Sequence, residues 1–166
     1  MVNNTTNNQE AIKTVNDLIK DIKVAMFTTI STDNKIISRP MQTQEVEFDG
    51  ELWFLTMKDT EKYQEIASNP NVNLAYAGKS YVSISGKAEF IEDTAKKKEY
   101  WNPVFDKMLD TSYDDPNVVL IKVDVDSAEY WDSGDTLKSV KTFVKKLTNN
   151  ETEKDKKEIN DTVEFN

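Results

Sequence analysis

A succession of short strand-like segments, each bounded by turn residues, constrains the fold of this chain more than any other feature. Val, Ile, Thr and aromatic residues gather in segments 24–30, 36–46, 52–56, 72–77, 81–91, 118–125 and 128–131. Such segments form β-strands, and tight turns such as Phe48-Asp49-Gly50 join antiparallel neighbours. Pro40 indicates that segment 36–46 is an edge strand or carries a bulge, because proline has no N–H to donate. Gly86 indicates a bulge in segment 81–91, whose apolar residues keep one parity on both sides of it.

Three helices are predicted around these strands. Segment 8–23 carries apolar residues at helical spacing. Segment 61–68 follows a capping residue, Asp59 or Thr60, and stops at Asn69-Pro70. Segment 93–110 is helical with a break at Asn102-Pro103. The pattern therefore predicts a mainly β (α+β) fold, a closed or partly closed antiparallel barrel of six or seven strands with flanking helices.

Residues 1–135 are expected to form one barrel domain with its N-terminal helix, and residues 136–166 a separate tail. Five apolar residues at helical spacing between 137 and 147 predict an amphipathic helix with lysines on the opposite side. Such a helix docks on the barrel or lies on a membrane surface, and so few apolar residues favour docking. Segment 149–161 is highly charged, and segment 162–166 could add a short strand.

Composition excludes several classes of function. A net charge of −9 opposes nucleic acid, so any phosphate must be held by a local cationic pocket. The chain has no His and no Cys, which excludes Ser-His-Asp and Cys-His catalysis and the usual zinc sites, and no metal site is expected. Its four glycines form neither a P-loop nor a dinucleotide fingerprint. No membrane span and no secretory signal are evident, so we expect a cytoplasmic protein.

Arg39 is the one arginine among 21 basic residues, the others being lysines. A planar guanidinium grips carboxylate or phosphate with two parallel hydrogen bonds, which lysine cannot do. In this lysine-rich chain, Arg39 therefore serves either as a ligand-binding residue or as one half of a structural salt bridge. Both interpretations stay open on composition alone.

A second cation is predicted close to Arg39. Segment 56–62 turns from a strand end into a helix start, where free backbone N–H groups and the helix dipole favour an anion. Thr56 and Thr60 could add hydroxyl donors, and Lys62 falls in the first helical turn. The dipole disfavours a cation there, unless an anion lies beside it. The alternative is an ordinary capped helix with a solvated lysine.

A series of motifs now indicates a family. Their order is SRPM, the Phe-Asp-Gly turn, LWFLT, KDTEK, NPNVNLAY, YVSISGKAEF, WNP and AEYWD. Over residues 24–134 this order resembles the general stress protein 26 branch of the pyridoxamine 5'-phosphate oxidase-like family of FMN-binding split barrels. The resemblance implies an FMN cofactor, a homodimer with FMN between its subunits, and a small-molecule electron donor and acceptor that the sequence does not identify.

The resemblance also implies roles for individual residues, although none is identified as catalytic. Arg39 and Lys62 would bind the FMN phosphate, with Thr60 at the start of the same helix. The remaining expected contacts are backbone groups along the flavin ring, the end of the third strand near the ribityl chain, and a tryptophan from the partner subunit: Pro40, Met41, Gln42, Leu55, Thr56 and Trp131. Glu61 stands where the oxidases carry a second phosphate arginine, which puts the tightness of FMN binding in question.

Two functions remain open at this stage. The first is a flavin-dependent oxidoreductase, and the second is a non-catalytic FMN-binding or storage protein of the stress response. A barrel that binds haem or a deazaflavin is a third alternative, but the usual haem ligands are absent. A pyridoxamine 5'-phosphate oxidase proper is also considered. We expect no such activity, because residues 132–138 after Trp131 contain neither arginine nor histidine for the substrate phosphate.

Overall fold

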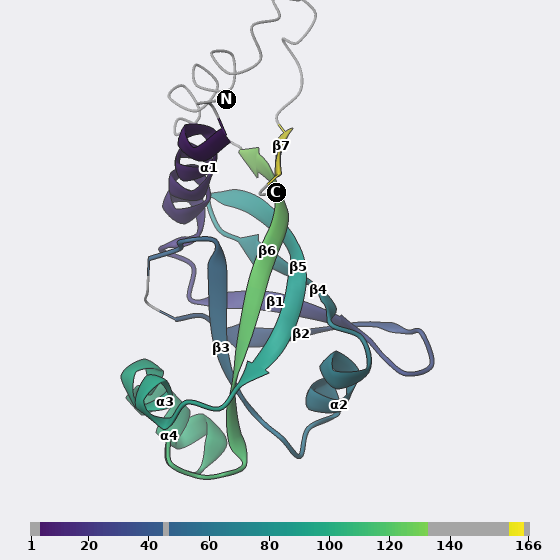
Figure 1. Cartoon of the computed structure of the whole chain (residues 1–166), viewed down its shortest axis with the longest axis vertical. Coiled ribbons are helices and arrows are strands. Elements are labelled where there is room, and N and C mark those ends of the chain that lie inside the picture. The colour runs from purple at the N-terminus through teal and green to yellow at the C-terminus, as the bar shows by residue number, and fades with distance from the viewer. Residues whose placement is uncertain (1–3, 45–46, 133–159, 165–166) are drawn as a thin grey trace, which may run out of the picture.

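The architecture is a strongly curled antiparallel sheet with helices at its margins. A computed structural model describes residues 4–44, 47–132 and 160–164 (Figure 1). In chain order the elements are α1 (Asn4–Ile19), β1 (Val24–Ile30), β2 (Ile36–Gln42), β3 (Glu51–Met57), α2 (Glu61–Ser68), β4 (Asn71–Ala77), β5 (Ser80–Ile91), α3 (Thr94–Tyr100), α4 (Pro103–Leu109), β6 (Val118–Asp132) and β7 (Asn160–Glu164). The strands follow the order β2-β1-β4-β5-β6-β3, and β7 pairs with β6. The predicted split-barrel fold with flanking helices is confirmed.

Strand β6 connects the two halves of the sheet. Its first half pairs with β3, its second half with β7, and β5 runs along nearly its whole length. The prediction of two strands, 118–125 and 128–131, is therefore wrong. Asp126 is an extra residue in a bulge, because Ser85 pairs with Ser127 while Gly86 pairs with Val125. The extra residue reverses which positions face the core, and this reversal made one strand look like two.

Gly86 lies opposite that bulge, so the extra residue is in β6 and not in segment 81–91, where the sequence analysis had placed the bulge. A Cβ atom at this position would lie 2.3 Å from the backbone oxygen of Asp124. That oxygen belongs to the paired neighbouring strand and cannot move away without disrupting the ladder. Close approach of two backbones, rather than an unusual dihedral angle, is the reason for glycine here.

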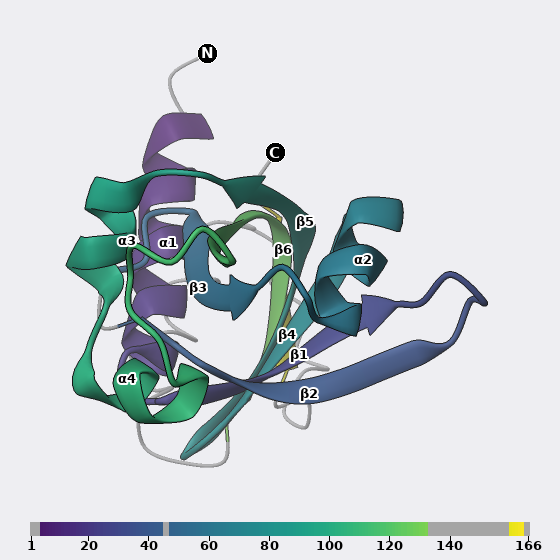
Figure 2. The ribbon, with the colours of Figure 1, turned by 90° about the horizontal axis from the view of Figure 1, so that it is seen from below.

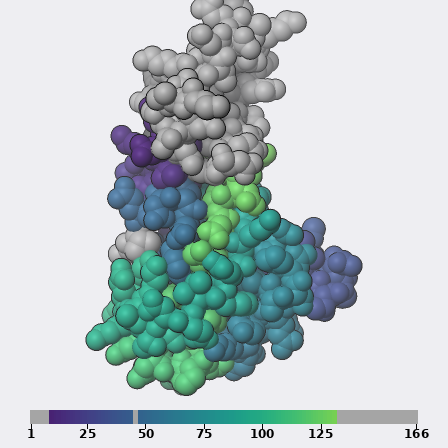
Figure 3. All heavy atoms as spheres, in the orientation of Figure 1, coloured from purple at the N-terminus to yellow at the C-terminus, as the bar shows by residue number. Residues whose placement is uncertain are grey.

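Strand β2 forms one edge of the sheet, which confirms the edge position inferred from Pro40. Seen from below, the sheet wraps round the core and the β1–β2 hairpin extends away from the body (Figure 2). The same hairpin protrudes from the side in the space-filling view (Figure 3). The strand ends at Gln42, earlier than the expected limit of 46.

The apolar interior forms two clusters. The larger one lies between the sheet and α1, with Phe27, Leu74 and Ile84 fully buried at its centre. The smaller one lies under α3 and α4, around Phe105. Among the residues described, no helix has the length and apolar character needed to cross a bilayer.

Most predicted helices are observed close to their expected limits. Helix α2 matches its predicted range, and the break at Asn102-Pro103 divides α3 from α4. Helix α1 begins at residue 4 and ends at residue 19, four residues earlier at each end than predicted. Strand β7 covers residues 160–164, which overlaps the strand suggested for 162–166. The amphipathic helix expected between 137 and 147 lies outside the described residues.

Candidate functional site

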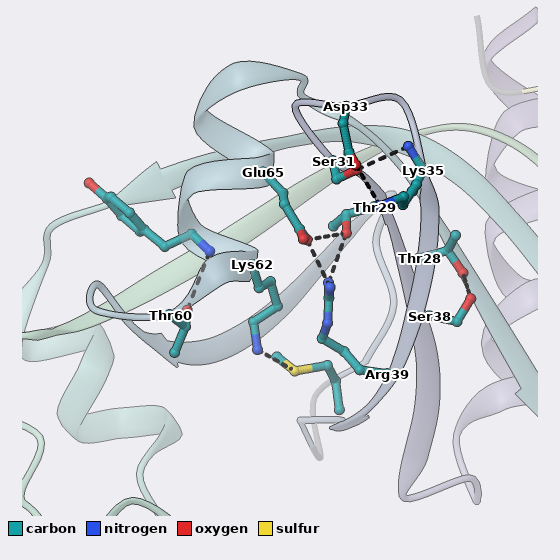
Figure 4. Close-up of polar contacts among 12 residues, drawn as sticks. Thr28, Thr29, Ser31, Asp33, Lys35, Ser38, Arg39, Thr60, Lys62 and Glu65 are labelled. Atoms are coloured by element: carbon teal, nitrogen blue, oxygen red, sulfur yellow. Dashed lines mark hydrogen bonds and ion pairs between the residues drawn. The ribbon is translucent and has the colours of Figure 1, made fainter.

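Arg39 lies on β2, in a polar network with two buried side chains (Figure 4). Its Nη2 donates to Oε2 of Glu65 over 2.8 Å, and its Nη1 donates to the Thr29 hydroxyl over 2.8 Å. The Thr29 hydroxyl in turn donates to the same Glu65 oxygen over 2.6 Å. Strand β2, strand β1 and helix α2 each supply one member of this closed triangle. Arg39 is thus a salt-bridge residue, whatever else it binds.

Lys62 stands beside Arg39 and lacks a carboxylate partner within the described part of the chain. Its Nζ donates to the sulfur of Met41 over 2.9 Å, which is a weak acceptor (Figure 4). Burial, followed by the nearby Arg39 guanidinium, lowers the pKa of Lys62 from 10.5 to about 8, and Glu65 offsets this only in part. A desolvated ammonium beside a second cation is an arrangement that an added anion would stabilise.

The first turn of α2 adds two donors to the site. The backbone N–H groups of Glu61 and Lys62 have no acceptor within the helix, since an α-helix leaves its first N–H groups free. Thr60 is the N-cap, and its hydroxyl oxygen accepts the N–H of Tyr63 over 3.3 Å. Its own proton goes to the Met57 carbonyl. Thr60 therefore shapes this helix end in the ligand-free chain, while the Glu61 side chain is exposed.

The outer edge of β2 presents unpaired backbone groups next to these cations. The N–H of Thr43 donates to Lys23 at one end of the β1–β2 ladder, and Ser31 donates to Lys35 at the other. Hydrogen-bonded pairs alternate along an antiparallel ladder, so Arg39 and Met41 bond to β1. The backbone groups of Pro40 and Gln42 consequently point away from β1, toward the free edge.

Two expected contacts on β3 lie in the interior. Leu55 packs in the smaller apolar cluster with Phe105, so its side chain is directed away from the cations. Thr56 is also buried and falls on the opposite side of the strand. The chain then turns from Met57 through Thr60 into α2, which links the end of β3 to the Lys62 site.

Trp131 is on a different strand from the cation site. It lies near the end of β6, opposite Tyr81 on β5, and three strands separate β6 from β2 in the sheet order. Trp131 and Tyr81 belong to the outer face of the sheet, together with Val24 and Met26 of β1. These four side chains are between 36% and 55% exposed, although all are large and apolar or aromatic.

The part of this outer face around Val24, Met26 and Tyr81 carries few charges, whereas its other end holds the ion pairs of Lys122 with Glu51, Glu89 and Asp124. One row across it reads Pro40, Met26, Ala75, Ser83 and Glu129, in paired order. Contiguous exposed apolar surface in a protein of this size marks an interaction site. In a chain of net charge −9, a part of the surface with few charges is also one on which electrostatic repulsion between copies is small.

Sequence reasoning brought Arg39 and Lys62 together correctly but missed Thr29 and Glu65. Glu65 follows Lys62 by three residues and precedes Ile66, which is buried, so it falls on the inward face of α2. A glutamate on the buried face of a short helix is the signal that could have found it, since buried carboxylates are paired. Nothing local marked Thr29. Within residues 4–44, 47–132 and 160–164, no cluster of acidic residues is arranged to hold a metal ion.

Comparison with known proteins shows which family this chain resembles in sequence and fold. Residues 10–155 match the family described as pyridoxamine 5'-phosphate oxidase like. General stress protein 26 of Bacillus subtilis is 28% identical over 136 residues, covering 78% of this chain and 94% of that protein. A crystal structure of general stress protein 26 from Bacillus anthracis superposes with a TM-score of 0.65 and 27% identity, covering 73% of this chain and 93% of the other. A related protein from Clostridium acetobutylicum shares the fold, with a TM-score of 0.64, 16% identity, and coverage of 75% and 89%.

Proposed function

The chain belongs to the pyridoxamine 5'-phosphate oxidase-like family, and on this basis we propose that it binds FMN as a flavin-dependent oxidoreductase of the general stress protein type. The observation that carries the proposal is the desolvated Lys62 beside Arg39, without a carboxylate of its own among the described residues. Such a pair of cations suits a terminal phosphate monoester.

The groups around Lys62 suit a phosphate both because they are positively charged and because they donate hydrogen bonds. The ammonium supplies a point charge, and the free N–H groups at the start of α2 supply hydrogen bonds along the helix dipole. Arg39 retains three of its five N–H donors after its bonds to Thr29 and Glu65. FMN is favoured over FAD because the chain lacks a glycine-rich dinucleotide turn.

The free edge of β2 fits the polar rim of a flavin ring. Backbone groups of Pro40 and Gln42 face that edge, so they could orient the ring without any charged side chain. When bound, FMN would supply the hydride and electron transfer chemistry, which no side chain of this protein provides. The protein would bind the phosphate, orient the ring and exclude water from it.

We further propose that the functional unit is a homodimer formed through the part of the outer face that carries few charges. Val24, Met26 and Tyr81 would be covered by the same face of a second copy, as in an isologous twofold interface. Trp131 lies on this face and away from the β2 edge of its own subunit, which supports its contribution to the FMN site of the other copy.

A non-catalytic FMN-binding or storage protein is the second candidate, since the same site would serve both functions. Anaerobic addition of NADH or NADPH to the FMN-loaded protein separates them. Rapid loss of the flavin absorbance, followed by its return with an electron acceptor, supports the oxidoreductase. A flavin that neither nicotinamide reduces supports the storage role.

Purification and titration test FMN binding itself. The protein should be yellow, and mass spectrometry of the released ligand should identify FMN. Arg39→Ala should weaken FMN binding by about 1.5–3 kcal/mol, the usual strength of a hydrogen bond to a charged group. Lys62→Ala should weaken FMN binding somewhat less, because an ammonium is a point charge and lacks the parallel N–H donors of a guanidinium. Colourless protein that fails to bind micromolar FMN would refute the proposal.

A further inference from the structure

Glu65 lies between two cations but pairs with only one of them. It follows Lys62 by three residues on α2, a spacing at which helix side chains can meet. Its carboxylate nevertheless bonds to Arg39 of β2, 26 residues away in the sequence. Lys62 instead donates a hydrogen bond to the Met41 sulfur over 2.9 Å. Glu65 thereby neutralises the guanidinium, and no carboxylate in the part of the chain that the structure describes forms an ion pair with the Lys62 ammonium.

The triangle of Thr29, Arg39 and Glu65 holds the guanidinium in one orientation. Thr29 is fully buried and Glu65 is 5% exposed, so neither partner can exchange its hydrogen bonds for water. One edge of the Arg39 fork is occupied by these two partners, and the remaining N–H donors are directed elsewhere. Figure 4 shows the Lys62 side chain reaching down beside the guanidinium from α2.

We infer that Glu65, assisted by Thr29, is a positioning residue that orients Arg39 toward the phosphate of the bound ligand. This inference rests on the proposed function, because it assumes that the Arg39–Lys62 site receives a phosphate monoester. Glu65 itself does not contact the ligand. Its role is to keep the planar fork fixed, so that binding does not have to order a long, flexible side chain.

If Glu65 competes with the ligand instead of positioning Arg39, the predicted change in phosphate affinity has the opposite sign. If Glu65 only competed with the ligand for Arg39, its neutralisation would free the guanidinium and tighten phosphate binding. The charge of the site alone also predicts tighter phosphate binding, because Glu65→Gln raises the summed charge of Arg39, Lys62 and Glu65 by one. A positioning role predicts weaker binding despite the more positive site. The sign of the change therefore decides between the interpretations.

The experiment measures FMN and riboflavin binding to the full-length protein by quenching of flavin fluorescence. Riboflavin lacks the phosphate and serves as the matched ligand. For Glu65→Gln we expect the Kd for FMN to rise about tenfold or more, the lower end of what a charge-assisted contact is worth. The Kd for riboflavin should change less than about twofold. Thr29→Val should raise the FMN Kd by about threefold, less than Glu65→Gln because the Glu65 ion pair still holds Arg39, and Thr29→Ser should restore it.

A double variant tests whether Glu65 acts through Arg39. In an Arg39→Ala background, Glu65→Gln should produce no further loss of FMN affinity, because the group that it positions is gone. Unchanged or tighter FMN binding in Glu65→Gln overturns the inference, and so does an equal loss of FMN and riboflavin. If Glu65→Gln does not fold, the Thr29 pair gives the same decision. A wild-type protein that binds no FMN removes the proposed function, an outcome that is visible before any variant is made.

Discussion

Deprotonation of Lys62 is expected to weaken FMN binding about tenfold between pH 7 and pH 9. The pKa of this lysine is lowered to about 8, by burial first and by Arg39 second. About nine-tenths of the side chains carry the charge at pH 7, and about one-tenth at pH 9. The phosphate monoester is a dianion throughout this range, since its second pKa is about 6. The change in FMN affinity therefore reflects the protonation state of Lys62.

Titration at pH 7, 8 and 9 measures the effect, with Lys62→Arg as the matched control. Arginine keeps its charge over this range, so the variant should bind FMN with nearly constant affinity. Riboflavin controls for any ionisation of the flavin ring. A wild-type affinity that stays constant from pH 7 to pH 9, or one that falls equally in Lys62→Arg, would refute a phosphate contact by Lys62.

The same pKa shift predicts an opposite trend for the stability of the FMN-free protein. Between pH 8 and pH 10.5 the folded state has released the Lys62 proton, whereas the unfolded state still binds it. The free energy of unfolding then rises with pH over this window. Compared with Lys62→Met, the wild-type protein should gain stability from pH 8 to pH 10 in urea unfolding. A constant difference between the two proteins would contradict the lowered pKa.

Three further predictions concern the interface, the bulge and the chemistry. Met26→Glu should convert the proposed dimer to monomers in light scattering, whereas Met108→Glu, at an exposed site on α4 away from the outer face, should leave the mass unchanged. Gly86→Ala should lower the free energy of unfolding by about 1–3 kcal/mol, because the added Cβ meets the Asp124 carbonyl; unchanged urea unfolding would contradict this. The FMN-loaded protein should not oxidise pyridoxamine or pyridoxine 5'-phosphate, and turnover of about one per second would refute that expectation.

Features that depend on neighbouring residues were predictable from the sequence. The limits of β1 and α2 follow from local alternation, from the capping Thr60 and from Pro70. The edge position of β2 follows from Pro40, since proline at an inner strand would leave a carbonyl without a donor. The nearness of Arg39 and Lys62 was a hypothesis built on two separate motifs and on the family resemblance, because no local pattern joins a strand to a helix 23 residues later.

Other features could not be read from local patterns. The bulge at Asp126 is a mismatch between two strands, so a single strand's pattern shows only an apparent break. Thr29 looks like any strand threonine, and its importance comes from the two charged groups that pack against it. Whether Val24 and Met26 are exposed likewise depends on which face of the sheet the helices cover, and only the tertiary structure decides this.

By itself, then, the sequence determined which segments are strands and helices, and it restricted phosphate recognition to lysines and one arginine. Tertiary structure decided how those charges are used. Burial removed water from Lys62 and lowered its pKa, while Glu65 paired with Arg39 instead of with its neighbour on the helix. The physical reason is that solvation and charge pairing depend on distance in space, and folding brings β1, β2 and α2 to one end of the barrel.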